Sequence, residues 1–467
     1  MRALLVNPSQ FRAYGVQMPT PYPPLGLLSI GAVWRRLGVQ VRYLDMDLDG
    51  PDGLDRLVRE FRPDVLGVTA TTPVFTDAEA VARRVRGIVP GVYPIIGGPH
   101  ATAYPSDVLA SGDFQAAVVG EGEETACEII DRLDRGDRDL TGVRGTWFRR
   151  QGEVVSNPRR PLIRDLDSLP FPDRSLLPGL DAYSPPDAIR RPVATVMASR
   201  GCPGRCTFCC SPAAFGAVVR YRKVESVVEE IREAIEIHGA REIHFADDSL
   251  TEDKAWTLEL CAGLRAAEFP VQYMFMNGLR VNRVDGEMLR ALRSIGMENV
   301  GFGIESGSPR ILEALRKGID LEEARRNIQL AKSLGFATWC FFIIGSPGET
   351  DESAMETIDF AKRANPDFAK FFVFKPFPGT RAYRELAESG HLVNYERDLT
   401  GIYTRPVHVL DEMGPDRMMY WLRRANREFY LRPRKIADHA RRIRSVTQLR
   451  YNLRSLRFVV GMMLRAA

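Results

Sequence analysis

Short apolar runs alternate with helical patterns along the first third of the chain. Runs that would form buried strands cover 3–6, 40–44, 65–69, 93–96 and 116–119. Apolar residues recur every three or four positions, as on a helix with one buried face, over 25–37, 54–61 and 77–88. Strands that alternate with helices predict an α/β fold with a Rossmann-like, doubly wound parallel sheet, which binds ligands at the carboxyl ends of its strands.

The same alternation returns after residue 192. Strand-like runs cover 193–198, 242–245, 271–276, 299–304, 338–344 and 368–374. Helical patterns lie between them, over 226–238, 254–267, 286–294, 321–334 and 352–364. Six parallel strands with helical crossovers predict a partial (β/α)6 barrel. In such a barrel the functional residues lie on the loops that follow the strands.

Prolines separate these two regions. They interrupt every helical or strand pattern at positions 158, 161, 170, 172, 178, 185, 186 and 192. We therefore expect a Rossmann-like domain over 1–150, a proline-rich linker over 151–192, a barrel over 193–385 and a basic, mostly helical C-terminal region over 386–467.

Composition narrows the class of protein. The chain has 467 residues, 45% of them hydrophobic, and 64 basic against 60 acidic residues give a formal charge of +4. This balance gives no basis for predicting a nucleic-acid partner. No signal peptide or membrane-spanning apolar run is visible. Seven cysteines, three of them clustered, are typical of a protein of the reducing cytoplasm.

The C-terminal tail differs from the rest in charge. Residues 416–467 contain 14 Arg or Lys and 3 acidic residues, and apolar residues recur at helical spacing at 449, 453, 456, 460 and 463. One interpretation is a basic amphipathic helix that makes peripheral contact with the inner face of a membrane. The other is a helical cap over the barrel, with arginine stems reaching to water.

The most specific chemical feature is a cysteine triplet directly after the first barrel strand. Cys202, Cys206 and Cys209 are separated by three and then two residues. Three thiolates can hold three irons of a 4Fe-4S cluster and leave the fourth open to a substrate. The alternative is a structural zinc knuckle with Cys210 as fourth ligand. Because Cys127, Cys210, Cys261 and Cys340 are scattered, we expect no second cluster.

With Phe208 just before its third cysteine, the triplet resembles the hallmark of the radical S-adenosylmethionine superfamily. The resemblance implies that the open iron binds S-adenosylmethionine and that one electron from the cluster cleaves it to a deoxyadenosyl radical. It also implies an external electron donor of the flavodoxin or ferredoxin type.

Polar residues follow the later barrel strands, in loops similar to those of cobalamin-dependent radical enzymes and tRNA methylthiotransferases. The residues that this resemblance assigns to S-adenosylmethionine binding are Asp247, Arg280, Glu305, Ser306, Gly345 and Pro376. Among them Arg280, Glu305 and Ser306 would contact the ribose or the methionine part, and the Gly345 loop would pack near the adenine. The alternative for each polar residue is a loop cap or a surface ion pair.

The N-terminal loops carry a second resemblance, to cobalamin-binding Rossmann domains. The positions that carry it are Pro24, Leu25, Asp45, Asp47, Gly50, Thr69, Thr71, Thr72, Gly97, Gly98, His100, Gly120, Glu121 and Gly122. Asp47 stands where that family has its cobalt-ligating histidine, so the lower ligand of the cobalt is unassigned, and His100 is the nearest replacement. The alternatives are a support role for His100 in a turn, and a generic nucleotide-binding or structural domain.

Together the two resemblances imply a cobalamin-dependent radical enzyme. We expect a methyltransferase that acts on an unactivated carbon, or on phosphorus, of a small metabolite or lipid. The alternative is ring closure, ring contraction or oxidative rearrangement with the same cofactors. A tRNA methylthiotransferase is disfavoured because the N-terminal domain contains one cysteine, Cys127. A non-catalytic sensor lacks a recognisable DNA-binding helix pair.

Overall fold

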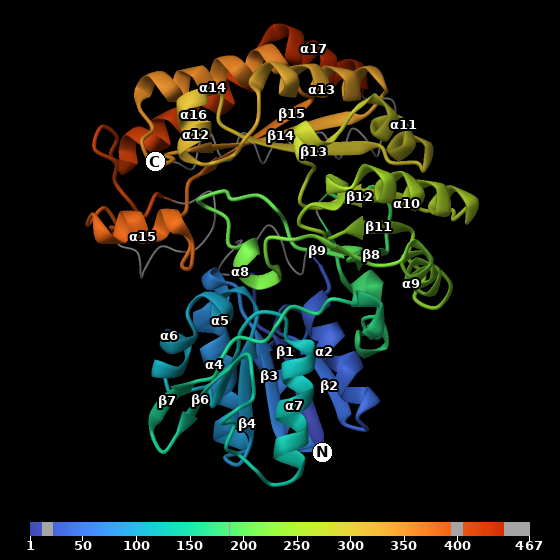
Figure 1. The fold of residues 1–467 in the computed structure, drawn as a ribbon, viewed down its shortest axis with the longest axis vertical. Helices are drawn as coiled ribbons and strands as arrows, with labels where there is room; N and C mark the ends of the chain where they lie inside the picture. The colour runs from blue at the N-terminus through green and yellow to red at the C-terminus, as the bar shows by residue number, and fades with distance from the viewer. Residues whose placement is uncertain (12–21, 186, 394–404, 443–467) are drawn as a thin grey trace.

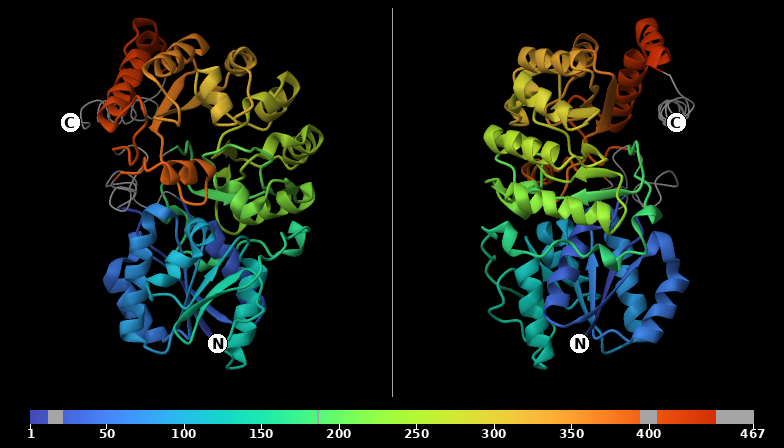
Figure 2. Two further views of the ribbon diagram at one scale, coloured as in Figure 1. Left: turned by 60° about the vertical axis from the view of Figure 1, so that its left-hand side comes forward. Right: turned by 90° about the vertical axis from the view of Figure 1, so that its right-hand side faces the viewer.

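The computed structural model describes residues 1–11, 22–185, 187–393 and 405–442. An N-terminal α/β domain lies below a second domain built from two small sheets and their helices (Figure 1). The side views show the same stacking, with the strands of the lower domain directed at the upper one (Figure 2).

The N-terminal domain is built on a parallel sheet of five strands with the order β2-β1-β3-β4-β5. Its strands are β1 (Arg2–Asn7), β2 (Gln40–Asp45), β3 (Val65–Thr69), β4 (Tyr93–Gly97) and β5 (Ala116–Val118). Its helices are α2 (Leu25–Arg36), α3 (Met46–Phe61), α4 (Phe75–Ile88), α5 (Pro99–Ala103), α6 (Pro105–Ala110) and α7 (Glu123–Asp134). The predicted doubly wound sheet is confirmed.

Helices cover both faces of this sheet. Leu4 and Val6 of β1 point to a core shared with α3 and α4, whereas Ala3 and Leu5 point to a core shared with α2 and α7. Successive side chains of a strand point to opposite faces, so a strand buried on both faces is apolar throughout. This burial explains the uninterrupted apolar runs.

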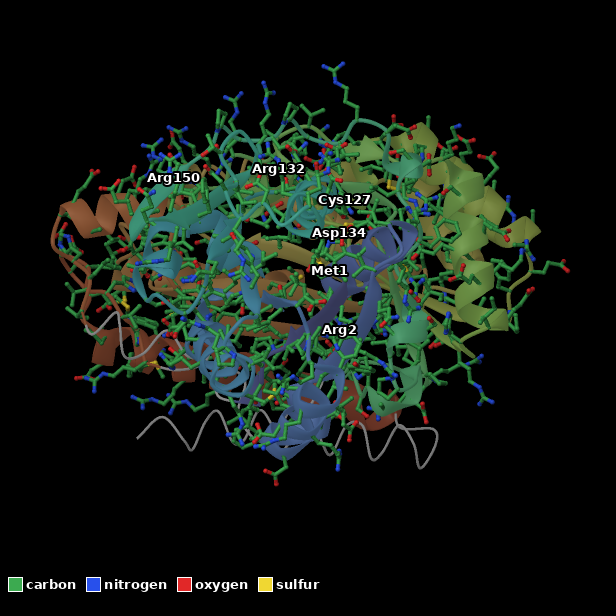
Figure 3. The ribbon with its side chains drawn as sticks, turned by 90° about the horizontal axis from the view of Figure 1, so that it is seen from below. Met1, Arg2, Cys127, Arg132, Asp134 and Arg150 are labelled. Carbon is green, nitrogen blue, oxygen red and sulfur yellow. The ribbon has the colours of Figure 1, made fainter. Side chains whose placement is uncertain are left out.

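Two antiparallel strands that the sequence did not reveal extend the sheet beyond β5. β6 (Thr146–Arg150) pairs with β5, and β7 (Glu153–Ser156) pairs with β6. The sheet therefore continues past the domain boundary predicted at residue 150. Seen from below, Met1 and Arg2 lie at the start of β1 and Arg132 and Asp134 at the end of α7 (Figure 3). The carboxyl ends of the strands consequently face the upper domain.

The upper domain contains the six parallel strands predicted for a partial barrel. They form two sheets, β12-β11-β8 and β13-β14-β15, joined by a parallel bridge between Leu279 and Phe302. The strands are β8 (Val193–Val196), β11 (Glu242–Phe245), β12 (Gln272–Phe275), β13 (Asn299–Glu305), β14 (Ala337–Ile344) and β15 (Phe368–Val373). The helices between them are α9 (Val224–Glu236), α10 (Lys254–Ala266), α11 (Gly286–Ser294), α12 (Pro309–Ala314), α13 (Leu321–Ser333) and α14 (Asp351–Ala364).

The proline-rich linker is part of the core of the upper domain. Its residues Leu177, Leu180 and Tyr183 are buried among the side chains of that core. The C-terminal region adds α15 (Arg381–Glu388), α16 (Pro415–Tyr430) and α17 (Pro433–Arg442). Trp421 and Phe429 of α16 are buried in the same core, so this helix covers the outer face of the β13–β15 sheet.

The apolar repeat at 449–463, which motivated the membrane interpretation, lies outside the described residues. Within the described ranges, the helices are too short or too polar to cross a membrane.

Candidate active site

The cysteine loop is held at both ends by a small hairpin. β9 (Ser199–Arg200) precedes the loop, and β10 (Arg220–Tyr221) follows it and pairs with β9. Two backbone hydrogen bonds fix the middle of the loop: the Thr207 N–H donates to Leu315, and the Ala382 N–H donates to the Thr207 carbonyl. The loop is therefore anchored to elements from three parts of the upper domain.

Four thiols lie within this loop, those of the cysteine triplet and that of Cys210. A Cβ added at Gly204 would lie 3.3 Å from the Cys202 sulfur and 3.8 Å from the Cys206 sulfur, so a side chain there would crowd both ligands. Burial raises the pKa of Cys206, and raises that of Cys209 to about 12. In the described ranges, no three His, Cys, Asp or Glu side chains converge as the ligands of a single ion do. Three free, partly buried thiols in one loop are a donor set that fits an iron–sulfur cluster.

Charged side chains surround Cys206. The Lys317 ammonium lies 2.7 Å from the Glu305 carboxylate, and both residues act electrostatically on the Cys206 thiol. Burial alone would lower the pKa of Lys317, but the charge of Glu305 raises it. Arg280, which also acts on Cys206, pairs with Glu252 at 2.8 Å. Cations and a carboxylate in one place suit the carboxylate and amino groups of a methionine moiety.

Glu305 adopts a backbone conformation that is uncommon for a residue with a side chain. Its φ is 70°, in the left-handed region, and such strain is often found at functional sites. A Cβ at Gly303 would lie 2.8 Å from the Glu305 carboxylate and 3.0 Å from the Lys317 ammonium. The chain therefore leaves room for this ion pair. The sequence did not single out Lys317, because it follows a helix and no strand.

Other residues assigned from the sequence support the framework of the site. Asp247 is buried beneath the start of the cysteine loop and accepts hydrogen bonds from the Ala198 and Ser199 backbones and the Ser199 hydroxyl. Burial raises its pKa to about 7. The Ser306 hydroxyl lies 3.0 Å from that of Thr357 on α14 and accepts from the Ser308 N–H.

Two apolar residues of the prediction also lie in packed surroundings. Phe208 packs against a small apolar cluster that contains Ile311 and Phe374, and Pro376 is buried. These contacts hold the cysteine loop against α12 and the end of β15.

The Gly345 loop is held through both backbone polar groups of Gly345. The Gly345 N–H donates to Glu349, and the Gly345 carbonyl accepts from the His408 ring at 2.7 Å. Burial raises the pKa of Glu349 to about 8 and lowers that of His408 to about 4. At neutral pH both side chains are therefore uncharged. The sequence did not reveal His408, which is 63 positions away along the chain.

A cavity of about 340 Å³ lies at the carboxyl edge of the N-terminal sheet. Eight of the residues predicted to bind cobalamin line it: Pro24, Leu25, Thr69, Gly97, Gly98, Gly120, Glu121 and Gly122. It continues between the sheet and α2 and α7, beside Leu5, Trp34 and Gly67. Met197, Arg200 and Arg222 of the upper domain form the opposite wall.

Missing side chains keep this cavity open. A Cβ at Gly67 would lie 2.7 Å from Leu5, and one at Gly98 would lie 2.6 Å from the Thr69 hydroxyl. The cavity is at the small end of the range for ligand sites, so it suits a nucleotide-sized part of a larger cofactor. An apolar cavity that opens onto polar glycine loops fits the base and the amide-bearing edge of a cobalamin.

The remaining predicted cobalamin residues are outside the cavity lining: Asp45 at the end of β2, Asp47 and Gly50 in α3, His100 in α5, and Thr71 and Thr72 after β3. The Asp45 carboxylate accepts hydrogen bonds from the Asn7 amide and the Tyr43 hydroxyl, and Asp45 is the N-cap residue of α3. The Asp47 carboxylate accepts hydrogen bonds from the Ser9 hydroxyl at 2.5 Å and from the Gln10 N–H at 2.9 Å. The residue in the position of the histidine ligand is thus bound to the loop after β1.

His100 lies between the loops that follow β3 and β4. Its Nδ1 is 3.2 Å from the Thr72 hydroxyl, and its ring lies 4.3 Å from that of Phe75. Burial lowers its pKa to about 4, so the ring is neutral. Its buried Nε2 has no hydrogen-bond partner in the described part of the chain. Its contacts with Thr72 and Phe75 agree with the support role, and a role of the unpaired Nε2 as cobalt ligand stays a prediction.

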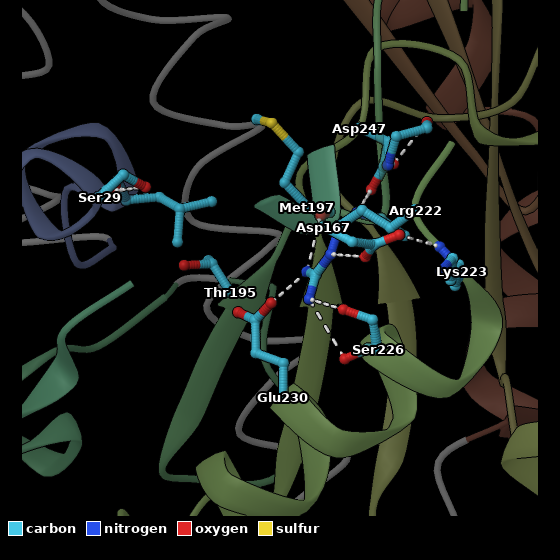
Figure 4. Close-up of polar contacts among 12 residues, drawn as sticks. Ser29, Asp167, Thr195, Met197, Arg222, Lys223, Ser226, Glu230 and Asp247 are labelled. Carbon is cyan, nitrogen blue, oxygen red and sulfur yellow. Dashed lines mark hydrogen bonds and ion pairs between the residues drawn. The ribbon is translucent and has the colours of Figure 1, made fainter. Parts of the chain in front are cut away.

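Buried ion pairs join both ends of the cysteine loop to the N-terminal domain. Arg200 pairs with Glu121 and Glu123 of the N-terminal domain, and Arg220 also pairs with Glu121. Next to them, Arg222 contacts Glu230, the Ser226 side chain and backbone, Asp167 and the Met197 carbonyl (Figure 4).

Comparisons with known proteins agree with this arrangement. The family model of the Radical SAM superfamily matches residues 196–361, and that of the B12 binding domain matches residues 12–130. An uncharacterized methyltransferase of Pyrococcus horikoshii is 36% identical over 93% of both chains. The cytidylyl-2-hydroxyethylphosphonate methyltransferase of Streptomyces wedmorensis is 29% identical over 83% of this chain and 82% of its own.

Among solved structures, the chain resembles the radical S-adenosylmethionine methyltransferase TsrM from Kitasatospora setae, solved with cobalamin and a 4Fe-4S cluster bound. The TM-score is 0.69 at 21% identity, over 83% of this chain and 75% of that chain. At this identity the likeness shows a common fold.

Proposed function

The chain belongs to the radical S-adenosylmethionine enzymes that carry a B12 binding domain, and we propose that it methylates a carbon or phosphorus atom of a small molecule. Its cofactors are a 4Fe-4S cluster, S-adenosylmethionine and cobalamin. One observation carries the proposal: Met197 and Arg200, just before Cys202, form a wall of the cavity in the B12 binding domain. The two cofactor sites therefore share a wall.

When bound, these groups supply a deoxyadenosyl radical that removes a hydrogen atom from the substrate and a methyl group that replaces it. The side chains of this protein bind and position the reactants. We assign Cys202, Cys206 and Cys209 to three irons, and Glu305, Lys317 and Arg280 to the polar groups of S-adenosylmethionine. The Gly345 peptide, fixed by Glu349 and His408, would lie near the adenine.

Rigid attachment of the two domains matters for such a reaction, since the reacting groups must remain in contact distance. Glu121 supplies this attachment through Arg200 and Arg220, on either side of the cysteine loop. The three side chains are almost fully buried, so the contact also helps to exclude water.

An external one-electron donor of the flavodoxin or ferredoxin type would reduce the cluster. Pro203 and Arg205, between the first two cysteines, are exposed. The electron donor would approach the cluster through this exposed part of the loop, and this access supports the proposed donor.

The test uses anaerobically reconstituted protein, dithionite and S-adenosylmethionine with a trideuterated methyl group. We expect deoxyadenosine, together with label in the bound corrinoid. With a substrate present, label should also enter the product. Deoxyadenosine with an unlabelled product would contradict methyl transfer and favour ring formation or rearrangement. Failure to bind cobalamin would contradict the proposal as a whole.

A further inference from the structure

Strands β14 and β15 present two faces of different character. On one face, alternate residues such as Cys340, Phe342, Ala369 and Phe371 are fully buried against the covering helices. The residues between them point to the opposite face, the inner side of the partial barrel, and are half-buried. These inner residues are Trp339, Phe341, Ile343, Phe368, Lys370 and Phe372.

The inner face is aromatic. Trp339 stacks on Phe368 with 4.0 Å between ring centroids, and Phe341 lies 6.2 Å from Phe372. Gly301 of β13 leaves room for the Phe341 ring, since a Cβ there would lie 2.9 Å from it. These four aromatic rings provide a surface on which an apolar ring system can stack.

Lys370 is the one residue with a charge on this face of β14 and β15 within the described residues. Its ammonium lies 4.7 Å from the centre of the Trp339 ring and 5.9 Å from that of Phe341. Its ion pair with Asp187 is long, at 3.7 Å. β15 is an edge strand of its sheet, where a lysine is tolerated. Lys370 differs from an ordinary edge lysine because its ammonium lies over the aromatic rings of the inner face.

The wall formed by β11 carries a chain of hydrogen bonds. The Tyr22 hydroxyl lies 3.0 Å from His244 Nδ1, and His244 Nε2 lies 2.7 Å from Glu242. Glu242 also accepts the backbone N–H groups of Ile189 and Arg190, next to Asp187. Burial raises the pKa of Tyr22, and the charges of Asp187 and Glu242 raise it further.

Asp187 therefore connects the two walls. It acts on Tyr22 from one side and pairs with Lys370 on the other. In Figure 1 the sheet of β13–β15 lies above that of β8, β11 and β12, and Lys370 and His244 belong to these opposite sheets. Asp187 thus links the cation beside the aromatic rings to the hydrogen-bonded chain on the other sheet.

We propose that Lys370 anchors an acidic group of the substrate, while the rings beside it pack against an apolar ring system of the same molecule. The substrate class is accordingly a small ring-containing acid, carboxylate or phosphate, whose anionic group takes the place of Asp187 at the ammonium. A charge-assisted hydrogen bond to the substrate would replace the long contact to Asp187. This inference rests on the proposed function and extends it to the substrate.

Three probes of equal ring size test the assignment on the reconstituted holoenzyme: 2-naphthoate, 2-naphthyl phosphate and the neutral 2-naphthamide. Equilibrium dialysis gives the affinities. We expect one or both acids to bind about tenfold more tightly than the amide. Preference for the carboxylate or for the phosphate identifies the acidic group.

The matched variants are Lys370→Met, which keeps the stem that packs on Trp339, and Lys254→Met, which removes an exposed lysine on α10. Lys370→Met should bind all three probes alike, and Lys254→Met should keep the preference for acids. A preference that survives in Lys370→Met, or equal binding of acid and amide by the unaltered protein, would overturn the assignment.

A further variant tests whether the probes contact the aromatic rings. Trp339→Leu should weaken the binding of all three probes by a similar factor, and unchanged binding would contradict the aromatic contact. Cleavage of S-adenosylmethionine without substrate should persist in Lys370→Met. If the unaltered protein binds the probes but places no label from S-adenosylmethionine in its corrinoid, the proposed function fails and the binding site stands.

Discussion

Glu121 and Arg200 form an ion pair of 2.9 Å between the B12 binding domain and the residue that precedes the cysteine loop. Both side chains are nearly inaccessible, with exposed fractions of 3% and 11%. Arg220, directly after the loop, binds the same carboxylate at 2.8 Å. One carboxylate thus fixes both ends of the segment that would hold the cluster.

Replacing Glu121 by Gln should destabilise the protein and loosen this attachment. Removing one partner of a buried ion pair costs about 3 kcal/mol or more, because the other charges stay buried. Denaturant unfolding measures the loss. We also expect fewer methylated products per deoxyadenosine formed, since the cysteine loop and the B12 binding domain are less firmly held together.

The control for this variant is Glu124→Gln. Glu124 lies three residues further on, in the first turn of α7, but its side chain is 52% exposed and its contact with Arg160 is 3.6 Å long. The expected loss is below about 1 kcal/mol, as for other surface pairs. Equal losses in the two variants would contradict a special role for Glu121.

Substitution of the cysteines separates a cluster from a zinc knuckle. Cys202→Ala, Cys206→Ala and Cys209→Ala should each lose most of the bound iron and sulfide after anaerobic reconstitution. Cys210→Ala should retain both, because a cluster with one open iron needs three thiolates. Iron and sulfide analysis, together with mass spectrometry that identifies the bound metals, distinguishes a cluster from a zinc site. Loss of zinc in all four variants would support the zinc knuckle.

Strands buried on both faces were the most predictable part of the fold. The bounds of β11, β3 and α11 agree with the sequence prediction to the residue. The edge strand β7 and its neighbour β6 were missed, since Arg149, Arg150 and Glu153 break the apolar pattern there. Edge strands can carry such charges because one side faces solvent.

Local motifs made part of the site predictable. The cysteine triplet and the glycine loops lie within short stretches of sequence, so their spacing was visible. Lys317, His408 and Lys370 each come from a different element and have no neighbouring motif. Only the folded chain brings them beside Glu305, Gly345 and Asp187, and no sequence spacing reports such contacts.

Ser306 and Glu305 are adjacent but should differ in role. The hydroxyl of Ser306 is fully buried and bonded to Thr357, so Ser306→Ala should lower stability by about 1 kcal/mol. It should leave the rate of S-adenosylmethionine cleavage within about twofold. A large loss of cleavage would instead support the sequence prediction that Ser306 binds the nucleoside.

Glu305→Gln keeps the shape of the side chain but removes its charge beside Lys317. We expect S-adenosylmethionine to bind at least about tenfold more weakly, as for the loss of a charge-assisted contact. Equilibrium dialysis on the reconstituted protein measures this. Glu313→Gln, on the exposed side of α12, is the matched control and should bind normally.

Glu349 should make the stability of the protein depend on pH. Burial raises its pKa in the folded state to about 8, whereas an unfolded glutamate has a pKa of about 4.3. Between these values the folded protein holds a proton that the unfolded chain releases. The stabilisation from this group is therefore complete below pH about 4.3 and is lost as the pH rises toward 8. Glu349→Gln can still accept the Gly345 N–H but does not titrate.

The stability of the unaltered protein relative to Glu349→Gln should accordingly fall between pH 5 and pH 8. Melting temperatures of both proteins, measured across this range, give the difference, which should change by at least about 2 °C. Glu352→Gln, an exposed substitution on the first turn of α14, should show a constant difference over the same range. A constant difference for Glu349→Gln as well would mean that the buried carboxyl is already ionised at pH 5, with the Gly345 N–H as a stabilising donor.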